Sequence, residues 1–361
     1  MKKRLIAAGI AAVILAGALT GCEKRQIVPV SPSDGGRISA SNATVARFCA
    51  EYTRGASEKI KDYTDMYYPA GIDIAWRFDC DELPLYSFVT VSTRSDLGEG
   101  EKYVTAGTSV HVDDVPVNTD LYWQVEAVYA DHTVLSGIFR LRTAEEPRTY
   151  EIPKVSNTRD LGGYTAAGGK KVAQGMIIRG ANVDGANAET RRAMLDELGI
   201  KTDLDLRAPG EGTAGGGSSP LGKDVNYVNI SAPLYTGLRD EEKQAAFAEE
   251  IRVFTDEANY PIYFHCAIGR DRTGTLALVL LGLLGVAEET IWRDYEMSFL
   301  SQSGSADKVT AELMFGSNFG PTVDYLKSFG GRTFADNVER FLLSIGITGD
   351  EIKTIRKILL R

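Results

Sequence analysis

The stretch "HCAIGRDRTG" (residues 265–274) decides the fold of the second half of this 361-residue chain. It places a cysteine, several charges and two glycines between the apolar "PIYF" (261–264) and the apolar run "TGTLALVLLGLLGV" (273–286). The first segment has the length of a buried strand. The second has that of a buried helix, too short to cross a bilayer. We therefore expect the charged residues to form a strand-to-helix loop at the carboxyl edge of a sheet.

Segments of helix and strand character alternate around this loop. Helical spacing is found over 187–199 and 239–259, and short apolar runs typical of strands lie at 200–207, 226–230 and 261–265. Such alternation predicts a mostly parallel central sheet with helices on both faces. We assign this α/β domain to residues 150–361.

The preceding part of the chain has the pattern of a small all-β sandwich domain, assigned to residues 41–146. Between residues 72 and 143, five short runs rich in β-branched and aromatic residues are separated by turn formers. One face of the run 121–129 carries Leu121, Trp123, Val125 and Ala127. Together with Trp76, "PVNTDLYWQV" and "FRLRT" resemble a fibronectin type III domain, which implies a spacer or adhesion module with a protein or glycan partner.

The N-terminus is typical of an exported protein. Three basic residues precede the apolar stretch 5–19, which predicts a signal peptide over residues 1–21. The residues "LTGC" (19–22) resemble the lipobox of bacterial lipoproteins. This resemblance implies lipidation of Cys22 and anchoring in the bacterial cell envelope, the alternative being an ordinary signal peptide with an incidental cysteine. Residues 22–40 are polar and contain prolines and glycines, as expected of a flexible tether.

Charge and cysteine content narrow the function further. A net charge of −9 argues against a nucleic-acid binder, which would need a basic face. If Cys22 carries lipid, Cys49 and Cys80 are the pair left for a disulfide, and the sequence leaves open whether they meet. Cys266 then remains as a free thiol, which suggests a chemical role.

The residues of the loop are suited to binding an anion beside a nucleophile. A loop closing over residues 266–272 would aim backbone N–H groups inward. Gly269 permits the tight turn, and Arg272 can donate to two oxygens of a tetrahedral anion. A cysteine at a helix N-terminus beside arginines can have its pKa lowered from about 8.5 to between roughly 3.5 and 7.5. Cys266 would then be a thiolate, with Thr273 donating to its sulfur, and phosphoryl transfer to sulfur followed by hydrolysis is the predicted reaction.

His-Cys-x5-Arg-Thr-Gly is the signature of the cysteine-dependent protein tyrosine phosphatase superfamily. "CAIGRDRTG" resembles in particular the bacterial tyrosine/serine phosphatase family. The resemblance extends to "NTRDLGGY" (157–164), "KKVAQGMIIRGANV" (170–183), "LDLRAPGE" (204–211), "LGVAEETIWRDY" (284–295) and "LLSIGITGDEIKTIRKILL" (342–360). It therefore covers nearly all of residues 150–361.

The resemblance implies roles for individual residues. Cys266 would be the nucleophile, and the phosphate would be bound by Ala267, Ile268, Gly269, Arg270, Asp271 and Arg272. Asp271 would be the general acid, with Asp205 as the alternative, although either could instead be a structural partner. Supporting positions are His265, Gly274, Arg159, Asp160, Arg207 and Glu211, the last four through capping or ion pairing. No metal or cofactor is implied.

The predicted function is hydrolysis of phosphomonoesters, with phosphotyrosine or phosphoserine proteins as substrates. The family more often has lysine where this chain has Arg270, which leaves the substrate preference open. An inositol-phosphate or phosphoinositide phosphatase is the alternative, which Arg270 favours and which a basic pocket would favour further. A non-catalytic phosphate-binding adhesion lipoprotein is the alternative of another class. Sulfur or arsenate chemistry also uses cysteine loops, but without these combined motifs. Residues 301–320 could be a substrate lid or an ordinary helical insert.

Overall fold

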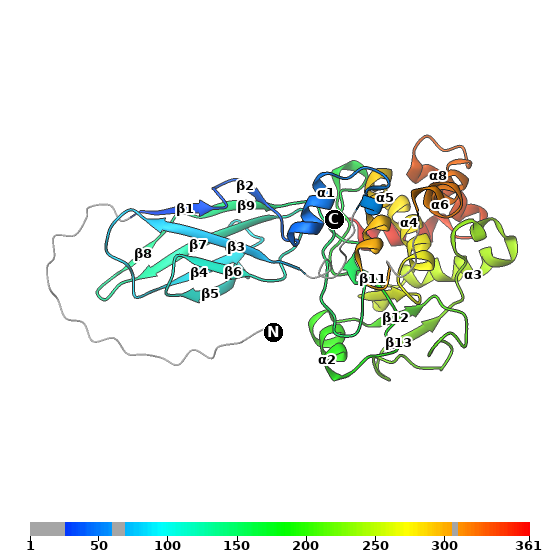
Figure 1. Ribbon diagram of the computed structural model, residues 1–361, viewed down its shortest axis with the longest axis horizontal. Helices are drawn as coiled ribbons and strands as arrows, with labels where there is room; N and C mark the ends of the chain where they lie inside the picture. The colour runs from blue at the N-terminus through cyan, green and yellow to red at the C-terminus, as the bar shows by residue number, and fades with distance from the viewer. Residues whose placement is uncertain (1–25, 60–68, 305–309) are drawn as a thin grey trace. The chain divides into compact units, whose positions relative to one another are not determined.

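The computed structural model describes residues 26–59, 69–304 and 310–361, and many of its helices and strands are labelled in Figure 1. The chain forms two compact units that alternate along the sequence. The first comprises Met1–Ile38, Asp73–Val112 and Asp120–Arg142, and the second comprises Ser39–Ile72, Asp113–Thr119 and Thr143–Arg361. The predicted signal peptide and Cys22 lie outside the described residues. Within those residues, no helix has the length and apolarity needed to cross a membrane.

The first unit is built from two sheets, as the alternating pattern predicts. One sheet has the order β1-β3-β6, and the other has the order β2-β9-β7-β4-β5 with β8 paired to β7. The strands are β1 (Ile27–Ser31), β2 (Gly36–Ile38), β3 (Ile72–Phe78), β4 (Tyr86–Ser92), β5 (Glu101–Thr105), β6 (Ser109–Val112), β7 (Asp120–Val128), β8 (Thr133–Leu135) and β9 (Phe139–Thr143). Every second residue of β7 from Leu121 to Ala127 is buried, which confirms the predicted inner face.

The structure corrects two boundaries of this unit. The segment expected to be a tether contains β1 and β2, because β1 pairs with β3 and β2 pairs with β9, each at the edge of its sheet. The sandwich expected over 41–146 is also interrupted, since α1 (Ala43–Ala50) belongs to the second unit. Its apolar residues Val45 and Phe48 are buried there. Cys49 and Cys80 are both free thiols in the structure.

The second unit contains a five-stranded sheet of order β10-β11-β14-β12-β13. Its strands are β10 (Arg159–Asp160), β11 (Ile177–Gly180), β12 (Thr202–Asp205), β13 (Asn226–Asn229) and β14 (Ile262–His265). All neighbours are parallel except β10 and β11, which confirms the predicted mostly parallel sheet. The carboxyl ends of the parallel strands therefore meet at one edge, the usual place of a ligand site.

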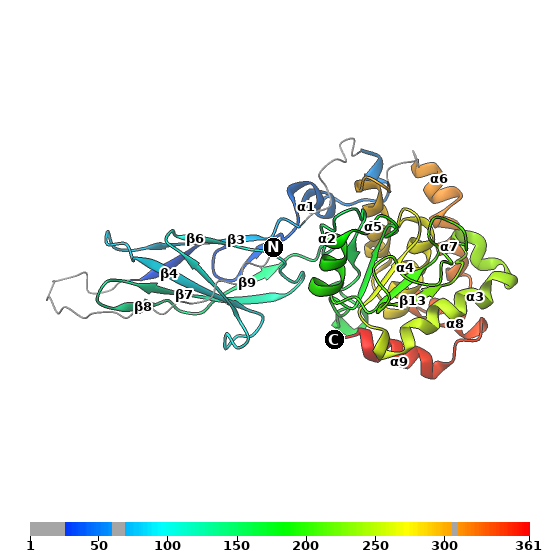
Figure 2. The same ribbon diagram turned by 90° about the horizontal axis from the view of Figure 1, so that it is seen from below.

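Both faces of this sheet are covered by apolar side chains. Ile177 and Phe264 join the larger core, whereas Ile178 and Tyr263, one residue along each strand, join a smaller core with Met194. Helices packed around the larger core are α3 (Glu241–Arg252), α4 (Asp271–Leu284), α5 (Glu288–Met297), α7 (Phe319–Lys327), α8 (Phe334–Ser344) and α9 (Gly349–Leu359), several of which are seen together in Figure 2. The smaller core is covered by α2 (Ala188–Arg191) and the π-helical turn Arg192–Glu197.

The helix that follows the loop is buried on all sides, as its sequence predicts. Residues 273–284 of α4 are all buried. Beyond α5, the described residues of the segment 301–320 form α6 (Ala311–Gly316) and the start of α7, where Met314 and Phe319 are buried. These described residues therefore form a packed helical insert.

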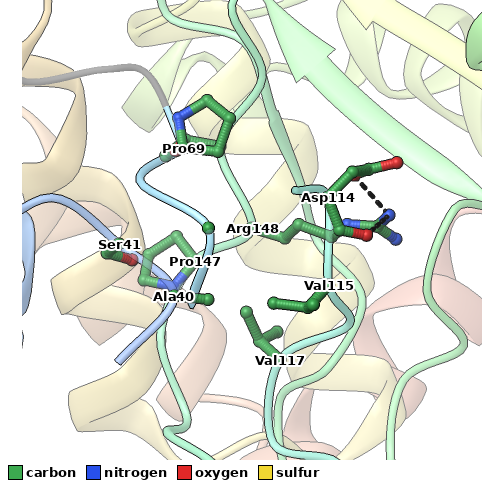
Figure 3. Close-up of a pocket in the computed structure, with 10 residues that line it drawn as sticks. Ala40, Ser41, Pro69, Asp114, Val115, Val117, Pro147 and Arg148 are labelled. Carbon is green, nitrogen blue, oxygen red and sulfur yellow. Dashed lines mark hydrogen bonds and ion pairs between the residues drawn. The ribbon is translucent and has the colours of Figure 1, made fainter. Parts of the chain in front are cut away.

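Four chain segments of the second unit meet around a small pocket, shown in Figure 3. Ala40, Pro69, Val117 and Pro147 contribute apolar walls, and the Asp114 carboxylate pairs with the Arg148 guanidinium at 2.6 Å. The free space is about 10 Å³, roughly enough for one water molecule. At this pocket, residues 39–41 and 113–119 lie beside residues 147–149. The pocket is too small to hold a substrate.

Candidate active site

The loop of residues 266–270 connects β14 to α4, and one position in the loop and one in the first turn of α4 require glycine. Gly269 has a φ of +72°, and a Cβ atom there would lie 2.4 Å from the carbonyl group of Gly180. At Gly274, a Cβ atom would lie 2.9 Å from the Tyr295 ring. The absence of these side chains lets the loop pass beside β11 and lets α4 approach α5.

The outward-facing carbonyl groups of the loop are fixed by side chains from neighbouring segments. Asn182 Nδ2 donates to the carbonyl of Ala267 (2.8 Å), and Asn157 Nδ2 donates to that of Ile268 (3.0 Å). Arg179 Nη2 donates to the carbonyl of Gly269 (2.9 Å). In a trans peptide the following N–H points away from the carbonyl, so these contacts aim the next amides toward the opposite side of the loop. The first N–H groups of α4, which lack intrahelical acceptors, add to this anion cradle.

Cys266 is buried at the start of the loop, with only 2% of its surface exposed. Burial by itself would raise the pKa of its thiol. Hydrogen bonding from the hydroxyl and the backbone N–H of Thr273, aided by the positive charge of Arg272, outweighs burial and lowers the pKa below its ordinary value. The thiol is therefore prepared to lose its proton.

Arg272 is held in a defined orientation by Glu211. Its Nη1 and Nη2 atoms donate to the two carboxylate oxygens at 2.8 and 2.7 Å. Arg207 forms a similar fork with Asp184, and it also binds the buried Asp205 at 2.8 Å. Burial would raise the pKa of Asp205, but its hydrogen bonds with Arg207 lower it. Arg207 and Glu211 thus form the ion pairs expected of supporting residues.

The side chain of Arg270, a loop residue expected to help bind phosphate, contacts its neighbour Asp271 and the segment that follows α5. Its Nε atom donates to Asp271 Oδ1 at 2.9 Å, and its Nη1 atom donates to the carbonyl of Gly304 at 2.7 Å. The guanidinium also lies 5.3 Å from the centre of the Phe299 ring. These contacts take the charge away from the anion cradle, because a neighbouring carboxylate and an aromatic face are available to it. Asp271 additionally accepts a hydrogen bond from the Tyr235 hydroxyl.

Arg159 supports the loop through a buried charge network. Asp294 on α5 accepts from Arg159 Nε at 2.8 Å and from Arg179 Nη1 at 2.5 Å, and all three side chains are buried. Burial would raise the pKa of Asp294, yet the two guanidinium groups hold it below its usual range. Arg159 also donates to Asn157 Oδ1 at 2.6 Å. Through their own hydrogen bonds to the loop carbonyls, Asn157 and Arg179 therefore connect this network to the loop.

The two remaining supporting residues, Asp160 and His265, have different partners. Asp160 accepts from the backbone N–H groups of Gly162 and Gly175 and so stabilises its own turn, in line with the expected capping role. Burial raises its pKa to about 6. His265 lies at the end of β14, where its Nε2 is 2.9 Å from Asp203 Oδ1 on β12.

Several residues at the site were not identified from the sequence. They are Asn157, Arg179, Asn182, Asp184, Tyr235 and Asp294. Most lie inside or beside the stretches that carry the family resemblance, so the motifs marked their neighbourhood. Their roles depend on contacts between distant segments, such as Arg179 with Asp294, that one sequence does not reveal.

The second half of the chain is similar in sequence to known proteins. A family model described as the tyrosine phosphatase family matches residues 150–361. A presumed tyrosine-protein phosphatase of Cupriavidus necator is 32% identical over 167 residues, covering 39% of this chain and 59% of the relative. A tyrosine-protein phosphatase of Nostoc commune is 28% identical over 145 residues, covering 34% and 48%. The chain thus spans less than two thirds of the length of these relatives.

Among solved structures, the core catalytic domain of the PP-IP phosphatase SIW14 from S. cerevisiae, in complex with citrate, is 16% identical. The match covers 42% of this chain and 86% of that chain, with a TM-score of 0.28. The family assignment comes from the sequence model, which covers residues 150–361 of the 361 in the chain. Through these residues, the protein belongs to the tyrosine phosphatase family.

Proposed function

We propose that the second unit hydrolyses phosphomonoesters through a cysteinyl-phosphate intermediate, with phosphotyrosine or phosphoserine proteins as substrates. The observation that carries this proposal is the Cys266 thiol, whose pKa is lowered although it is buried, beneath a loop with inward-facing amides. Arg272, oriented by Glu211, carries a positive charge that acts on the same thiol and can donate to two oxygens of a tetrahedral anion.

In the first step, Cys266 Sγ attacks phosphorus and the ester P–O bond breaks. Asp271 donates its proton to the departing oxygen, so that the alcohol or phenol leaves neutral. In the second step, water attacks phosphorus while the Asp271 carboxylate accepts a proton from it. The P–S bond then breaks, phosphate leaves, and the returning thiolate is stabilised by Thr273.

The surroundings of the two candidate acids favour Asp271. Asp205 is buried, and both of its carboxylate oxygens accept hydrogen bonds from Arg207, so a leaving group cannot reach it. Asp271 belongs to the first turn of α4 beside the loop, and a quarter of its side chain is exposed. A substrate oxygen entering the cradle can therefore approach Asp271.

The charge balance of the site favours a single phosphate group over a polyphosphate. Arg270 is paired with Asp271, Arg272 with Glu211, and Arg207 with Asp184 and Asp205. A substrate with several phosphates would require further cations not already engaged by carboxylates. For this reason we favour a phosphoprotein over an inositol polyphosphate.

A substrate profile tests the proposal. Purified protein should hydrolyse p-nitrophenyl phosphate and a phosphotyrosine peptide faster than inositol hexakisphosphate, with or without a chelator. Cys266→Ser should abolish turnover while phosphate binding is retained, whereas the matched control Cys80→Ser should stay active. Turnover by Cys266→Ser, or a requirement for a metal ion, would overturn the thiolate mechanism.

We also propose that Cys22 carries a lipid that anchors the protein in the cell envelope, and that the first unit contacts a protein or glycan. The support for the anchor is the sequence around residues 19–22. Replacement of Cys22 by serine should move the protein from the membrane fraction to the soluble fraction of the envelope. An unchanged distribution would contradict the anchor.

A further inference from the structure

Residues 42–59, which we call the N-terminal strap, precede the region matched by the family model but pack within the second unit. The strap consists of α1 and the short helical turn η1 (Ala56–Lys59). Figures 1 and 2 both show α1 beside α5. Val45 and Phe48 of the strap are buried against Met297 and Leu300, at and just beyond the end of α5.

A buried carboxylate on α5 depends on the strap for its hydrogen bonds. Glu296 is fully buried, and its Oε1 accepts from the Tyr52 hydroxyl (2.7 Å) and from the Gly55 N–H (2.8 Å). Its Oε2 accepts from the N–H (3.1 Å) and the hydroxyl (2.8 Å) of Ser57. Because a buried carboxylate is costly without such donors, these contacts bind the strap firmly to the end of α5.

The strap also binds the start of α5 and the start of α6. Arg54 pairs with Glu288 at 2.8 Å and with Glu289 at 2.7 Å in the first turn of α5. Glu58 accepts a hydrogen bond from the N–H of Ala311, the first residue of α6. The strap therefore anchors the chain on both sides of the segment 298–304.

This anchored segment contacts the catalytic loop. The carbonyl of Gly304 accepts from Arg270, and the ring of Phe299 lies against the same guanidinium. The hydroxyl of Ser303 donates to the carbonyl of Ile268 at 3.3 Å. Arg270 in turn donates to Asp271, so one continuous set of contacts connects Glu296 and the strap to Asp271.

We infer that the N-terminal strap is a positioning element for the general acid: it fixes the segment 298–304, and this segment holds Arg270 against Asp271. The inference rests on the proposed function of Asp271. It extends the working catalytic unit to residues far upstream of the family match. The strap acts on the protonation of the leaving group. The binding of phosphate by the loop amides and Arg272 should persist, because the Ile268 carbonyl also accepts from Asn157, which lies outside the strap.

The test uses the full chain and removes hydroxyl groups without leaving large cavities. The variants are Tyr52→Phe, Ser57→Ala and the two combined, which leave Glu296 with fewer donors. The matched control is Tyr260→Phe, because the Tyr260 hydroxyl makes one buried hydrogen bond, to Phe254 at 2.7 Å, beside the opposite end of β14. Each protein is assayed with p-nitrophenyl phosphate, which has a good leaving group, and with phenyl phosphate, which has a poor one.

A positioning role and a merely structural role give different results. Loss of folded protein would lower kcat equally for both substrates, whereas a displaced acid lowers it for phenyl phosphate in particular. The measured ratio is kcat for phenyl phosphate divided by kcat for p-nitrophenyl phosphate. We expect this ratio to fall about threefold or more in the combined variant, since small misplacements of a catalytic group are costly. KM should change little, and Tyr260→Phe should leave the ratio unchanged.

The same substitutions in an Asp271→Asn background complete the test, because residues that act through Asp271 can no longer change the ratio once the acid is absent. A ratio that stays constant in the strap variants would overturn the inference alone, provided that the parent enzyme is active. It would also be overturned if Asp271→Asn left the ratio of the parent unchanged. A parent without phosphatase activity would overturn both the proposed function and this inference.

Discussion

Cys266 owes its acidity to the residues that follow it in the chain, because burial acts in the opposite direction. The hydroxyl and the N–H of Thr273 stabilise the thiolate directly, and Arg272 adds a positive charge. Burial raises the pKa of the thiol, and only a few specific contacts lower it. A single substitution among those contacts should therefore change the pKa of Cys266.

The substitution Thr273→Ala should raise the pKa of Cys266, because it removes the hydroxyl that stabilises the thiolate. The rate at which iodoacetamide alkylates Cys266 at pH 6 should then fall several-fold, given that one pKa unit corresponds to about tenfold in thiolate fraction. The pH profile of alkylation measures this shift, and Thr322→Ala in the buried face of α7 serves as the control. An unchanged midpoint in the Thr273 variant would show that the hydroxyl does not contribute.

At this scale the sequence indicates which residues are near the reaction but not where each side chain points. Cys266, Thr273 and Arg272 could be placed at the site because strand, loop and helix follow one another directly. The side chains of Arg270 and Asp160 could not be placed in this way, because each residue had several possible partners within reach. The direction of Arg270 depends on Gly304 and Phe299, which lie about thirty residues later in the chain.

Among the elements, β14 and α4 were the most predictable, because a short apolar run and a long one flank the loop. Strands β1 and β2 were not recognised, since Pro29, Pro32 and the glycines nearby are also typical of a tether. Such residues are tolerated at the edge of a sheet, where an unpaired backbone group faces outward. The two-residue strand β10 is too short to leave a periodic signal.

The adjacent strands β14 and β12 are joined by His265 and Asp203, and this contact predicts a dependence of stability on pH. Burial would lower the pKa of His265, but the charge of Asp203 raises it above the ordinary value. Because the folded-state pKa is above the unfolded one, the stabilisation is complete below about pH 6.5 and is lost as the pH rises through the folded value.

Asp203→Asn should therefore lower the free energy of unfolding more at pH 6 than at pH 8.5. Urea denaturation of the parent and the variant at the two pH values measures the difference. The expected result is a parent that loses more stability than the variant on going from pH 6 to pH 8.5. An identical loss in both proteins would contradict the assigned role of the His265–Asp203 pair.

At the scale of the whole molecule, the second unit is assembled from three separate parts of the chain. The boundary near residue 150 could be predicted from the change in sequence pattern and agrees with the start of the family match. The sequence pattern did not predict that residues 39–72 and 113–119 also belong to the second unit. Contacts such as Tyr52 with Glu296 join residues 244 positions apart and leave no local pattern.

A fragment limited to residues 150–361 should consequently be less stable than the second unit of the full chain. It would lose the strap donors to Glu296 and also the hydrogen bond from Asn118 Nδ2 to the carbonyl of Gly163 (2.9 Å). Each buried polar group left without a partner costs about 1–3 kcal/mol. Thermal unfolding should show a lower Tm for the fragment than for the corresponding transition of the full chain, and equal Tm values would contradict the assembly described here.

The central claim, a covalent phosphate on Cys266, is tested most directly by trapping the intermediate. Asp271→Asn should slow its hydrolysis, so acid quenching during turnover of p-nitrophenyl phosphate should accumulate phosphoenzyme for peptide mass spectrometry. Phosphate should be attached to Cys266 in this variant and should be absent from the Cys266→Ser/Asp271→Asn double variant. Turnover without any phosphoenzyme, or phosphate attached to another residue, would contradict the central claim.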